Sequence, residues 1–262
     1  MTALGAALPP LLRTSALGRT LVAHEEIGST NDEAIRLARE GAPHGTVVLA
    51  ERQTAGRGRR GRSWAGAPGN VFLSVVLRPD LPPRRAPELV PVVAVAAAEA
   101  VRGAGVDAGI KWPNDLLVGG RKVAGILTEL SASAERIQSV VVGVGVNVNG
   151  LGADLPDEVR ATATSLREVL GRDVSRAELV AALLERLEGW LDRHAAGGFA
   201  PVRTRYRELS ATLGTRVRLI DADGTVEGVA EDIDEAGGLL LRRDDGTLER
   251  ARTGDVTSLR SV

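Results

Sequence analysis

The chain of 262 residues exceeds one average domain, so it has room for a main domain and a small appendage. Basic and acidic residues nearly cancel to a net charge of -1, which excludes an overall field that would draw the molecule to nucleic acid or to a membrane surface. The sequence has no cysteine, so it excludes disulfides, a thiol nucleophile and cysteine-bound metal, and it fits a reducing compartment such as the cytoplasm.

The first two thirds of the chain alternate between predicted helices and strands. Ser29 and Thr30 are good N-cap residues with acidic residues after them, so we predict a helix within residues 25–40. Residues 89–103 predict a mostly buried helix. It contains the longest apolar stretch, which a proline and a glutamate interrupt, so a membrane span is excluded. Strands are predicted over residues 45–50, 71–77, 108–112, 115–118, 122–130 and 138–149.

The composition changes near residue 213. Before it, apolar residues recur at helical spacing over residues 175–197 and predict an amphipathic helix. After it, short apolar segments alternate with Asp-Gly and Gly-Gly turns, which is typical of a small β-barrel. The strands predicted there are residues 216–221, 225–232, 239–243 and 247–252. We therefore predict an α+β protein with a main domain over residues 1–212 and a small barrel over residues 213–262.

A loop rich in glycine and arginine lies between two predicted strands and reads Gln53-Thr54-Ala55-Gly56-Arg57-Gly58-Arg59-Arg60-Gly61-Arg62-Ser63-Trp64. Glycines let backbone N–H groups turn toward an anion, and guanidinium groups neutralise phosphate or carboxylate. The loop therefore predicts a site for a phosphate-bearing ligand. The alternatives are a solvated basic loop and a nucleic-acid-binding tail, which its position between strands disfavours. It contains a G-x-G-x-x-G string, but its four arginines and the lack of a following helix argue against a dinucleotide turn.

Only two of the 33 basic residues are lysines, Lys111 and Lys122. Where lysine persists against such a bias, a compact ammonium is favoured over a planar guanidinium; the alternative is that the two positions arose by chance. Lys111 begins Lys111-Trp112-Pro113-Asn114-Asp115, and Lys122 follows a Gly-Gly turn, so both lie on one predicted hairpin. The ammonium, amide and carboxylate of this segment indicate a polar site, with an edge turn and its ion pair as the alternative.

Glycines at alternate positions mark the strand predicted over residues 138–149. Gly143 and Gly145 remove side chains from one face, so a ligand or another backbone can approach there, and Asn147 leaves a polar group near the end. A tightly packed core strand is the alternative, and it is compatible with a pocket wall.

Five segments, taken in order over residues 28–147, resemble the signature blocks of the biotin protein ligases. They are Gly28-Ser29-Thr30-Asn31, the loop from Gly56 to Trp64, the segment from Lys111 to Asp115, Arg121-Lys122-Val123-Ala124-Gly125-Ile126-Leu127, and Gly143-Val144-Gly145-Val146-Asn147. The resemblance implies a catalytic domain with a mixed sheet, like that of class II aminoacyl-tRNA synthetases, followed by a small SH3-like barrel.

The resemblance also implies roles for individual residues. Lys122 and Arg57 are the expected catalytic residues, because Lys122 would stabilise charge on biotin's carboxylate and on the α-phosphate of ATP. Asp115 is the expected contact for Mg²⁺, although metal-phosphate binding and biotin positioning both remain open for Asn114 and Asp115. The residues expected at biotin are Ser29, Thr30, Asn31, Gln53, Arg57, Gly58, Arg59 and Lys122. Those expected at ATP or the adenylate are Arg59, Arg62, Trp64, Asn114, Asp115 and Asn147.

The activity implied is ATP-dependent conversion of biotin to biotinyl-5'-AMP, followed by transfer to a lysine of a biotin carboxyl carrier domain of acetyl-CoA carboxylase or a related carboxylase. Bifunctional members carry a DNA-binding domain before the Ser29 block, whereas this sequence has only 28 residues there. We therefore expect a monofunctional cytoplasmic ligase, monomeric or weakly dimeric, that binds neither DNA nor membrane. The alternatives are a lipoate ligase or octanoyl transferase, which lacks the two basic motifs, and a nucleic-acid-binding module.

Overall fold

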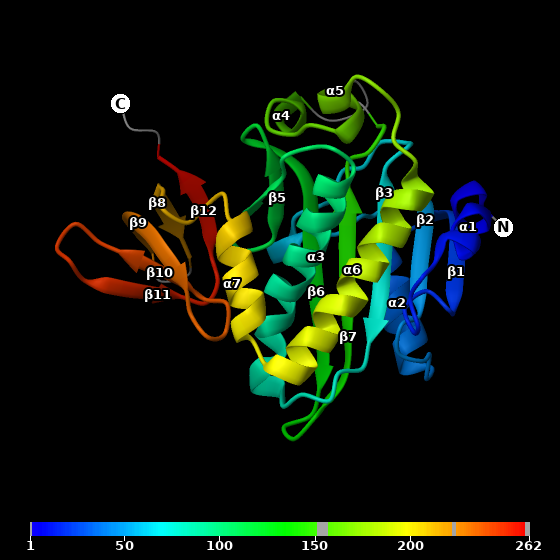
Figure 1. Cartoon of the computed structure of the whole chain (residues 1–262), viewed down its shortest axis with the longest axis horizontal. Coiled ribbons are helices and arrows are strands. Elements are labelled where there is room, and N and C mark those ends of the chain that lie inside the picture. The colour runs from blue at the N-terminus through cyan, green and yellow to red at the C-terminus, as the bar shows by residue number, and fades with distance from the viewer. Residues whose placement is uncertain (1, 151–156, 222–223, 260–262) are drawn as a thin grey trace.

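Two β-sheets organise the computed structural model, which describes residues 2–150, 157–221 and 224–259 (Figure 1). The larger sheet consists of β1 (Leu21–Ile27), β2 (Val47–Gln53), β3 (Val71–Leu77), β4 (Gly109–Lys111), β5 (Asp115–Val118), β6 (Arg121–Ala132) and β7 (Ile137–Val146). Its order is β1-β2-β3-β7-β6-β5-β4. β1 and β2 pair in parallel and the other neighbours pair antiparallel, so the sheet is mixed.

Helices cover the two faces of this sheet unequally. α3 (Leu89–Gly103) and α6 (Arg176–Gly197) pack against each other over one face (Figure 1). α2 (Thr30–Arg39) packs on the opposite face, against β2, β3 and β7. Because α2 has only 10 residues, part of its face of the sheet remains for other segments to cover. The cleft described below lies there.

Strand alternation decides which residues reach that face. Leu73 of β3 and Val144 of β7 belong to the core beneath α3 and α6. Their neighbours in sequence therefore point to the α2 face, since successive side chains of a strand alternate. Ser74 pairs with Gly143 and Phe72 pairs with Gly145 in the register of β3 and β7, which brings one hydroxyl and two bare strand positions together.

The second sheet is formed by the C-terminal part of the chain. It consists of β8 (Arg216–Ile220), β9 (Thr225–Ile233), β10 (Leu239–Arg242), β11 (Leu248–Ala251) and β12 (Asp255–Ser258), antiparallel in the order β11-β10-β9-β8-β12. The other elements are α1 (Ala3–Ala7), η1 (Pro9–Leu11), η2 (Arg59–Gly61), η3 (Pro83–Glu88), α4 (Asp157–Arg160), α5 (Leu166–Leu170) and α7 (Ala200–Leu209). In the described part of the chain, no helix combines the length and apolarity needed to cross a membrane.

This architecture confirms the predicted α+β class with a mixed sheet and a small C-terminal β-unit. The strand over residues 71–77 and the helix over residues 89–103 have the predicted bounds. Ser29 is the N-cap of α2, as predicted, without a side-chain capping bond, and residues 25–27 before it belong to β1, a strand that was not predicted. The predicted division at residues 212 and 213 lies between α7 and β8, and it stays a prediction.

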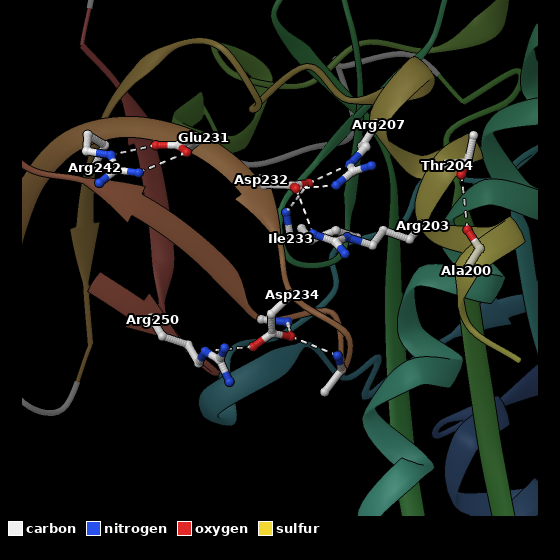
Figure 2. Close-up of polar contacts among 12 residues, drawn as sticks. Ala200, Arg203, Thr204, Arg207, Glu231, Asp232, Ile233, Asp234, Arg242 and Arg250 are labelled. Atoms are coloured by element: carbon white, nitrogen blue, oxygen red, sulfur yellow. Dashed lines mark hydrogen bonds and ion pairs between the residues drawn. The ribbon is translucent and has the colours of Figure 1, made fainter. Parts of the chain in front are cut away.

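α7 joins the two sheets through an ionic cluster (Figure 2). Asp232 on β9 accepts hydrogen bonds from Arg203 at 2.7 Å and from Arg207 Nε at 2.7 Å. A second contact comes from the larger sheet, because the Trp112 indole N–H donates to the Gly237 carbonyl at 3.0 Å. Burial acts to raise the pKa of Asp232, but the hydrogen bond from Arg207 and the neighbouring charges outweigh it, so its pKa lies below the ordinary value.

The Asp232→Ala variant should lose about 2 kcal/mol of unfolding free energy at neutral pH, because two guanidinium groups lose a largely buried acceptor. Because the pKa of Asp232 is lower in the folded state, its ionised form stabilises the fold above the unfolded pKa near 3.9, and this stabilisation is lost as the pH falls through the folded pKa. The difference in unfolding free energy between the variant and wild type should therefore shrink in acid. Urea unfolding at several pH values measures this. Glu231→Ala, which removes an exposed pair with Arg242 inside the small sheet, should change stability far less; equal losses would contradict the prediction.

Candidate active site

A cleft of about 270 Å³ opens on the α2 face of the larger sheet. The segment of residues 54–70, here called the Arg loop, covers it from one side, and β12 of the small sheet lines it from another. Five cationic side chains face two carboxylates in the lining, so the cleft suits an anionic ligand. The charged residues of the lining are Arg57, Arg59, Arg62, Lys111, Lys122, Asp115 and Asp255.

One end of the cleft is a buried polar pocket at the start of α2. Ser29, Thr30 and Asn31 are each 3–4% exposed. The Thr30 backbone N–H donates to Gln53 Oε1 at 2.7 Å, and the Thr30 hydroxyl lies 3.0 Å from the same oxygen. This group of hydroxyls and amides can recognise a small uncharged polar ring by paired donors and acceptors.

Two glycines of β7 make room for the neighbouring side chains. A Cβ at Gly143 would lie 2.2 Å from Asn31 Oδ1, and one at Gly145 would lie 2.5 Å from Cε2 of Trp64. Such distances are shorter than any normal contact, so both positions require glycine. The glycines were predicted to admit a ligand or another backbone, and in the structure the side chains of Asn31 and Trp64 occupy this space.

The Arg loop is folded as a tight turn. Gly58 N–H donates to the Arg62 carbonyl at 2.7 Å, and Trp64 N–H donates to the Gly56 carbonyl at 2.9 Å. Arg60, at the tip, has a φ of 56°, in the left-handed region. These bonds direct the arginines on either side of the tip toward the cleft and the small sheet.

Three arginines of the loop are held by groups from distant elements. Arg57 pairs with Asp32 and with Glu129, the latter at 2.5 Å, and the hydrogen bond with Asp32 is the main cause of its raised pKa. Arg62 pairs with Asp255 at 2.7 Å. Burial acts to raise the pKa of Asp255, but the hydrogen bond from Arg62 and its charge outweigh this, so the pKa is lowered.

Arg59 lies deeper than the other two. It donates to Asn114 Oδ1 at 3.0 Å and contacts the Gly254 carbonyl at 3.4 Å. Burial lowers the pKa of this guanidinium, because few groups around it replace the water it has lost. An anionic ligand in the cleft would satisfy it.

Lys122 lines the cleft beside Asp115 and Trp64. Its Nζ is 2.7 Å from Asp115 Oδ1 and 5.2 Å from the centroid of the Trp64 ring. Asp115 Oδ1 is buried, and the Lys122 ammonium is its ion-pair partner. The ammonium is positioned by one ion pair and one aromatic face.

The segment from Lys111 to Asp115 lines the cleft and also makes contacts that hold the surrounding structure. Lys111 and Asp115 are its charged residues in the lining. Asn114 donates through its amide to the Ile126 carbonyl at 2.7 Å and accepts from Arg59, so it fixes the hairpin beneath the Arg loop. The peptide bond before Pro113 is cis, and the preceding Trp112 makes the contact with the small sheet described above.

The structure brings all the predicted site residues except Asn147 into the cleft lining. Asn147 is buried beyond β7, where its amide donates to the Thr164 carbonyl at 3.1 Å and its oxygen faces Asn70, so its geometry gives the predicted nucleotide contact no support. Sequence reasoning missed Asp255 and Glu129. Glu129 had a signal, since it follows Gly125 at an even spacing on the same strand and therefore points to the same face.

No group of three or more histidine, cysteine, aspartate or glutamate side chains that could hold a metal occurs among the described residues. A metal that arrives with a phosphate ligand needs only one or two protein carboxylates, and Asp115 places one carboxylate in the cleft lining.

The chain matches known proteins over both parts. Residues 25–147 match the Biotin/lipoate A/B protein ligase family, and residues 212–257 match the Biotin protein ligase C terminal domain. The biotin protein ligase from Aquifex aeolicus, solved in complex with biotin and ATP, superposes with a TM-score of 0.78 at 30% identity, covering 93% of this chain and 100% of that one. The fold is thus that of the class II aminoacyl-tRNA synthetase-like ligases, with an SH3-like C-terminal unit.

Sequence relatives narrow the assignment. The biotin--[acetyl-CoA-carboxylase] ligase of Mycobacterium tuberculosis is 37% identical over 277 residues, 96% of this chain and 97% of the relative. The bifunctional ligase/repressor BirA of Bacillus subtilis is 40% identical over 247 residues, 94% of this chain and 76% of the relative. The chain belongs to the biotin protein ligase family.

The Gly145→Ala variant should lose about tenfold or more in biotin ligase activity, because the new methyl group displaces Trp64 and the displaced ring fills the cleft. Ligase assays and the fluorescence of Trp64 measure both effects. Gly189→Ala in α6, where a Cβ would meet nothing within 4 Å, should keep full activity and gain up to about 1 kcal/mol of stability. An active Gly145→Ala enzyme with unchanged fluorescence would contradict this account.

Proposed function

We propose that this protein activates biotin with ATP to biotinyl-5'-AMP and then transfers the biotinyl group to a lysine of a biotin carboxyl carrier domain of acetyl-CoA carboxylase or a related carboxylase. One observation carries the proposal: a neutral polar pocket and a cluster of cations line the same cleft in a member of the biotin protein ligase family. Biotin has a neutral urea ring at one end and a carboxylate at the other, so the cleft matches its polarity.

The first step must overcome charge repulsion, because biotin's carboxylate attacks the α-phosphate of a polyanion. Lys122 lies where the carboxylate end would come, and Arg57 and Arg59 approach from the Arg loop. Cations fixed in a partly buried cleft stabilise the charge that builds up in the transition state without reorganising. The carbon–oxygen bond of biotin stays intact, a phosphorus–oxygen bond forms, and diphosphate leaves.

The roles proposed for the lining follow this division. Ser29, Thr30, Asn31 and Gln53 bind the urea ring, while Arg57, Gly58, Arg59 and Lys122 hold the carboxylate. Arg59, Arg62, Trp64, Asn114 and Asp115 contact ATP or the adenylate. Asn147 keeps its proposed nucleotide contact only if the segment after β7 moves, since it now bonds within the scaffold.

The Arg loop exchanges partners during the reaction. Arg57 and Arg62 bind carboxylates of the protein in this structure, and the substrates' anionic groups take the place of these carboxylates. The loop then covers the mixed anhydride and excludes water, which protects a labile acyl donor from hydrolysis. Transfer occurs when a neutral lysine amine of the carrier attacks the acyl carbon and AMP leaves.

Mg²⁺ is part of the proposal as a companion of ATP. It would reduce the negative charge of the phosphates, and Asp115, whose carboxylate lines the cleft, is the residue that would hold it. A protein of this charge and composition is proposed to work in the cytoplasm, as a monomer or weak homodimer, with no affinity for DNA or membranes.

The Lys122→Ala variant should lose about a hundredfold or more of the adenylation rate, because the ammonium stabilises the developing charge, and Arg57→Ala should lose about tenfold. Diphosphate release reports the first step, and a streptavidin blot of a biotin carboxyl carrier domain incubated with biotin and MgATP reports both steps. Arg52→Ala is the matched control, since Arg52 pairs with Glu26 outside the cleft lining and should keep full activity. Full activity of Lys122→Ala would reject the proposed role of Lys122.

Filter binding with duplex and single-stranded DNA should show no retention at physiological salt, because Arg57, Arg60 and Arg62 already have carboxylate partners and the net charge is -1. The same filters loaded with a DNA-binding protein of similar size provide the control. Tight retention that falls steeply with added salt would instead favour a nucleic-acid-binding function for the Arg loop.

A further inference from the structure

Glu129 on β6 connects the polar pocket to the Arg loop without lining the cleft itself. One carboxylate oxygen accepts from the Asn31 amide at 2.8 Å, and the other accepts from Arg57 at 2.5 Å. Its side chain is 23% exposed, so both contacts are shielded from most of the solvent. The same carboxylate therefore touches a residue of each half of the site.

The contact with Glu129 fixes the orientation of Asn31. A carboxylate only accepts hydrogen bonds, so Asn31 must present its NH₂ group to Glu129 and its carbonyl oxygen to the other side. On that side the Ser74 hydroxyl lies 2.6 Å from Asn31 Oδ1. Ser74 has one hydroxyl proton, and it uses this proton in the hydrogen bond that it donates to Asn31 Oδ1.

This order continues to Thr30. The Thr30 hydroxyl lies 2.8 Å from Ser74 Oγ and 3.0 Å from Gln53 Oε1. Ser74 has no second proton to give, so Thr30 donates to Ser74 or to Gln53, and in both cases its proton is used inside the protein. Its oxygen therefore meets a ligand as an acceptor.

The orientation of the Gln53 amide is fixed as well, and it presents a donor where Thr30 presents an acceptor. Its Oε1 accepts the Thr30 backbone N–H at 2.7 Å, which leaves its NH₂ group as a donor. The pocket thus offers an acceptor at Thr30 beside a donor at Gln53. A cyclic urea presents an N–H beside a C=O, which is the matching pattern.

We propose that Glu129 is a positioning residue that sets the donor and acceptor order of the biotin pocket, acting through Asn31, Ser74 and Thr30. The inference rests on the proposed function, because it concerns recognition of the urea ring. If Glu129 could not demand a donor, Asn31 could turn its amide over and Ser74 could donate to the Thr30 oxygen, which lies 2.8 Å away. That oxygen would then have less capacity to accept from a ligand, and the preference of the pocket for a ligand N–H would weaken.

The experiment compares Glu129→Gln with Asp32→Asn. Both remove one carboxylate charge from Arg57, but Asp32 has no contact with Asn31 in the described structure, so Asp32→Asn reports the effect on the Arg loop alone. Biotin binding without ATP is measured by titration calorimetry. Glu129→Gln should weaken it about tenfold, whereas Asp32→Asn should change it less than about twofold. In steady state, Glu129→Gln should raise the KM for biotin more than it lowers kcat.

A second readout separates positioning from a general loss of structure. Cyclic carbamate analogues of biotin, in which oxygen replaces either ring N–H, need a donor where wild type offers an acceptor. The wild-type protein should prefer biotin strongly, and Glu129→Gln should reduce this preference by about tenfold or more. Ser74→Ala removes the link between Asn31 and Thr30 without touching Arg57, so in a Ser74→Ala background Glu129→Gln should leave this preference unchanged.

An unchanged preference in Glu129→Gln, or an equal drop in the Ser74→Ala background, would overturn the inference, as would equal biotin affinities of Glu129→Gln and Asp32→Asn. These outcomes differ from a failure of the proposed function. In that case the wild-type protein itself would bind no biotin and form no biotinyl-5'-AMP.

Discussion

The need to hold several positive charges in one small cleft governs much of this structure. Two unit charges 4 Å apart repel by about 4 kcal/mol at an effective dielectric constant of about 20, so an unbalanced cluster of cations would destabilise the fold. The protein places a carboxylate against each of three of them: Arg57, Arg62 and Lys122. These ion pairs keep the cleft assembled. Substrates that bring their own negative charge can then replace the protein carboxylates beside cations that are already in position.

This constraint explains why the small C-terminal sheet is part of the site. Asp255 belongs to β12, and its carboxylate holds Arg62 of the Arg loop. The position of that strand depends in turn on Asp232, which binds α7, and on the Trp112 contact with Gly237. A displacement of the small sheet would therefore reach the Arg loop directly, through an ion pair, rather than through a general change in stability.

The sequence contained most of the fold, because the central strands and helices have strong apolar patterns and clear turn residues. β1 was missed since its residues are only half buried or exposed, as on many edge strands, so its pattern lacks the apolar alternation of β3. β12 was missed because it has four residues, two of them polar and exposed. The site motifs predicted the cleft lining well because the residues of each motif are close in sequence.

The partners of these residues could not be predicted in the same way. Arg62 and Asp255 are 193 residues apart, and Arg57 and Glu129 are 72 apart, so only the packing of separate elements brings them together. The order of hydrogen bonds from Glu129 to Thr30 likewise depends on the register of β3, β6 and β7, which no local pattern specifies. A motif identifies the chemistry of a side chain, whereas the fold determines its orientation and its hydrogen-bond and ion-pair partners.

The two lysines show how the composition of the chain relates to the geometry of the cleft. In a chain where arginine replaces lysine almost everywhere, both Lys111 and Lys122 line the cleft. Lys122 lies low over the sheet, since a Cβ added at Gly125 would come within 3.2 Å of its Nζ, with the Trp64 ring on one side and Asp115 on the other. A planar guanidinium is larger and holds its donors in one plane, so it would fit this space only by giving up the ring or the carboxylate. An ammonium has three donors around one atom: it can keep Asp115 and still direct the other two toward an incoming carboxylate and phosphate.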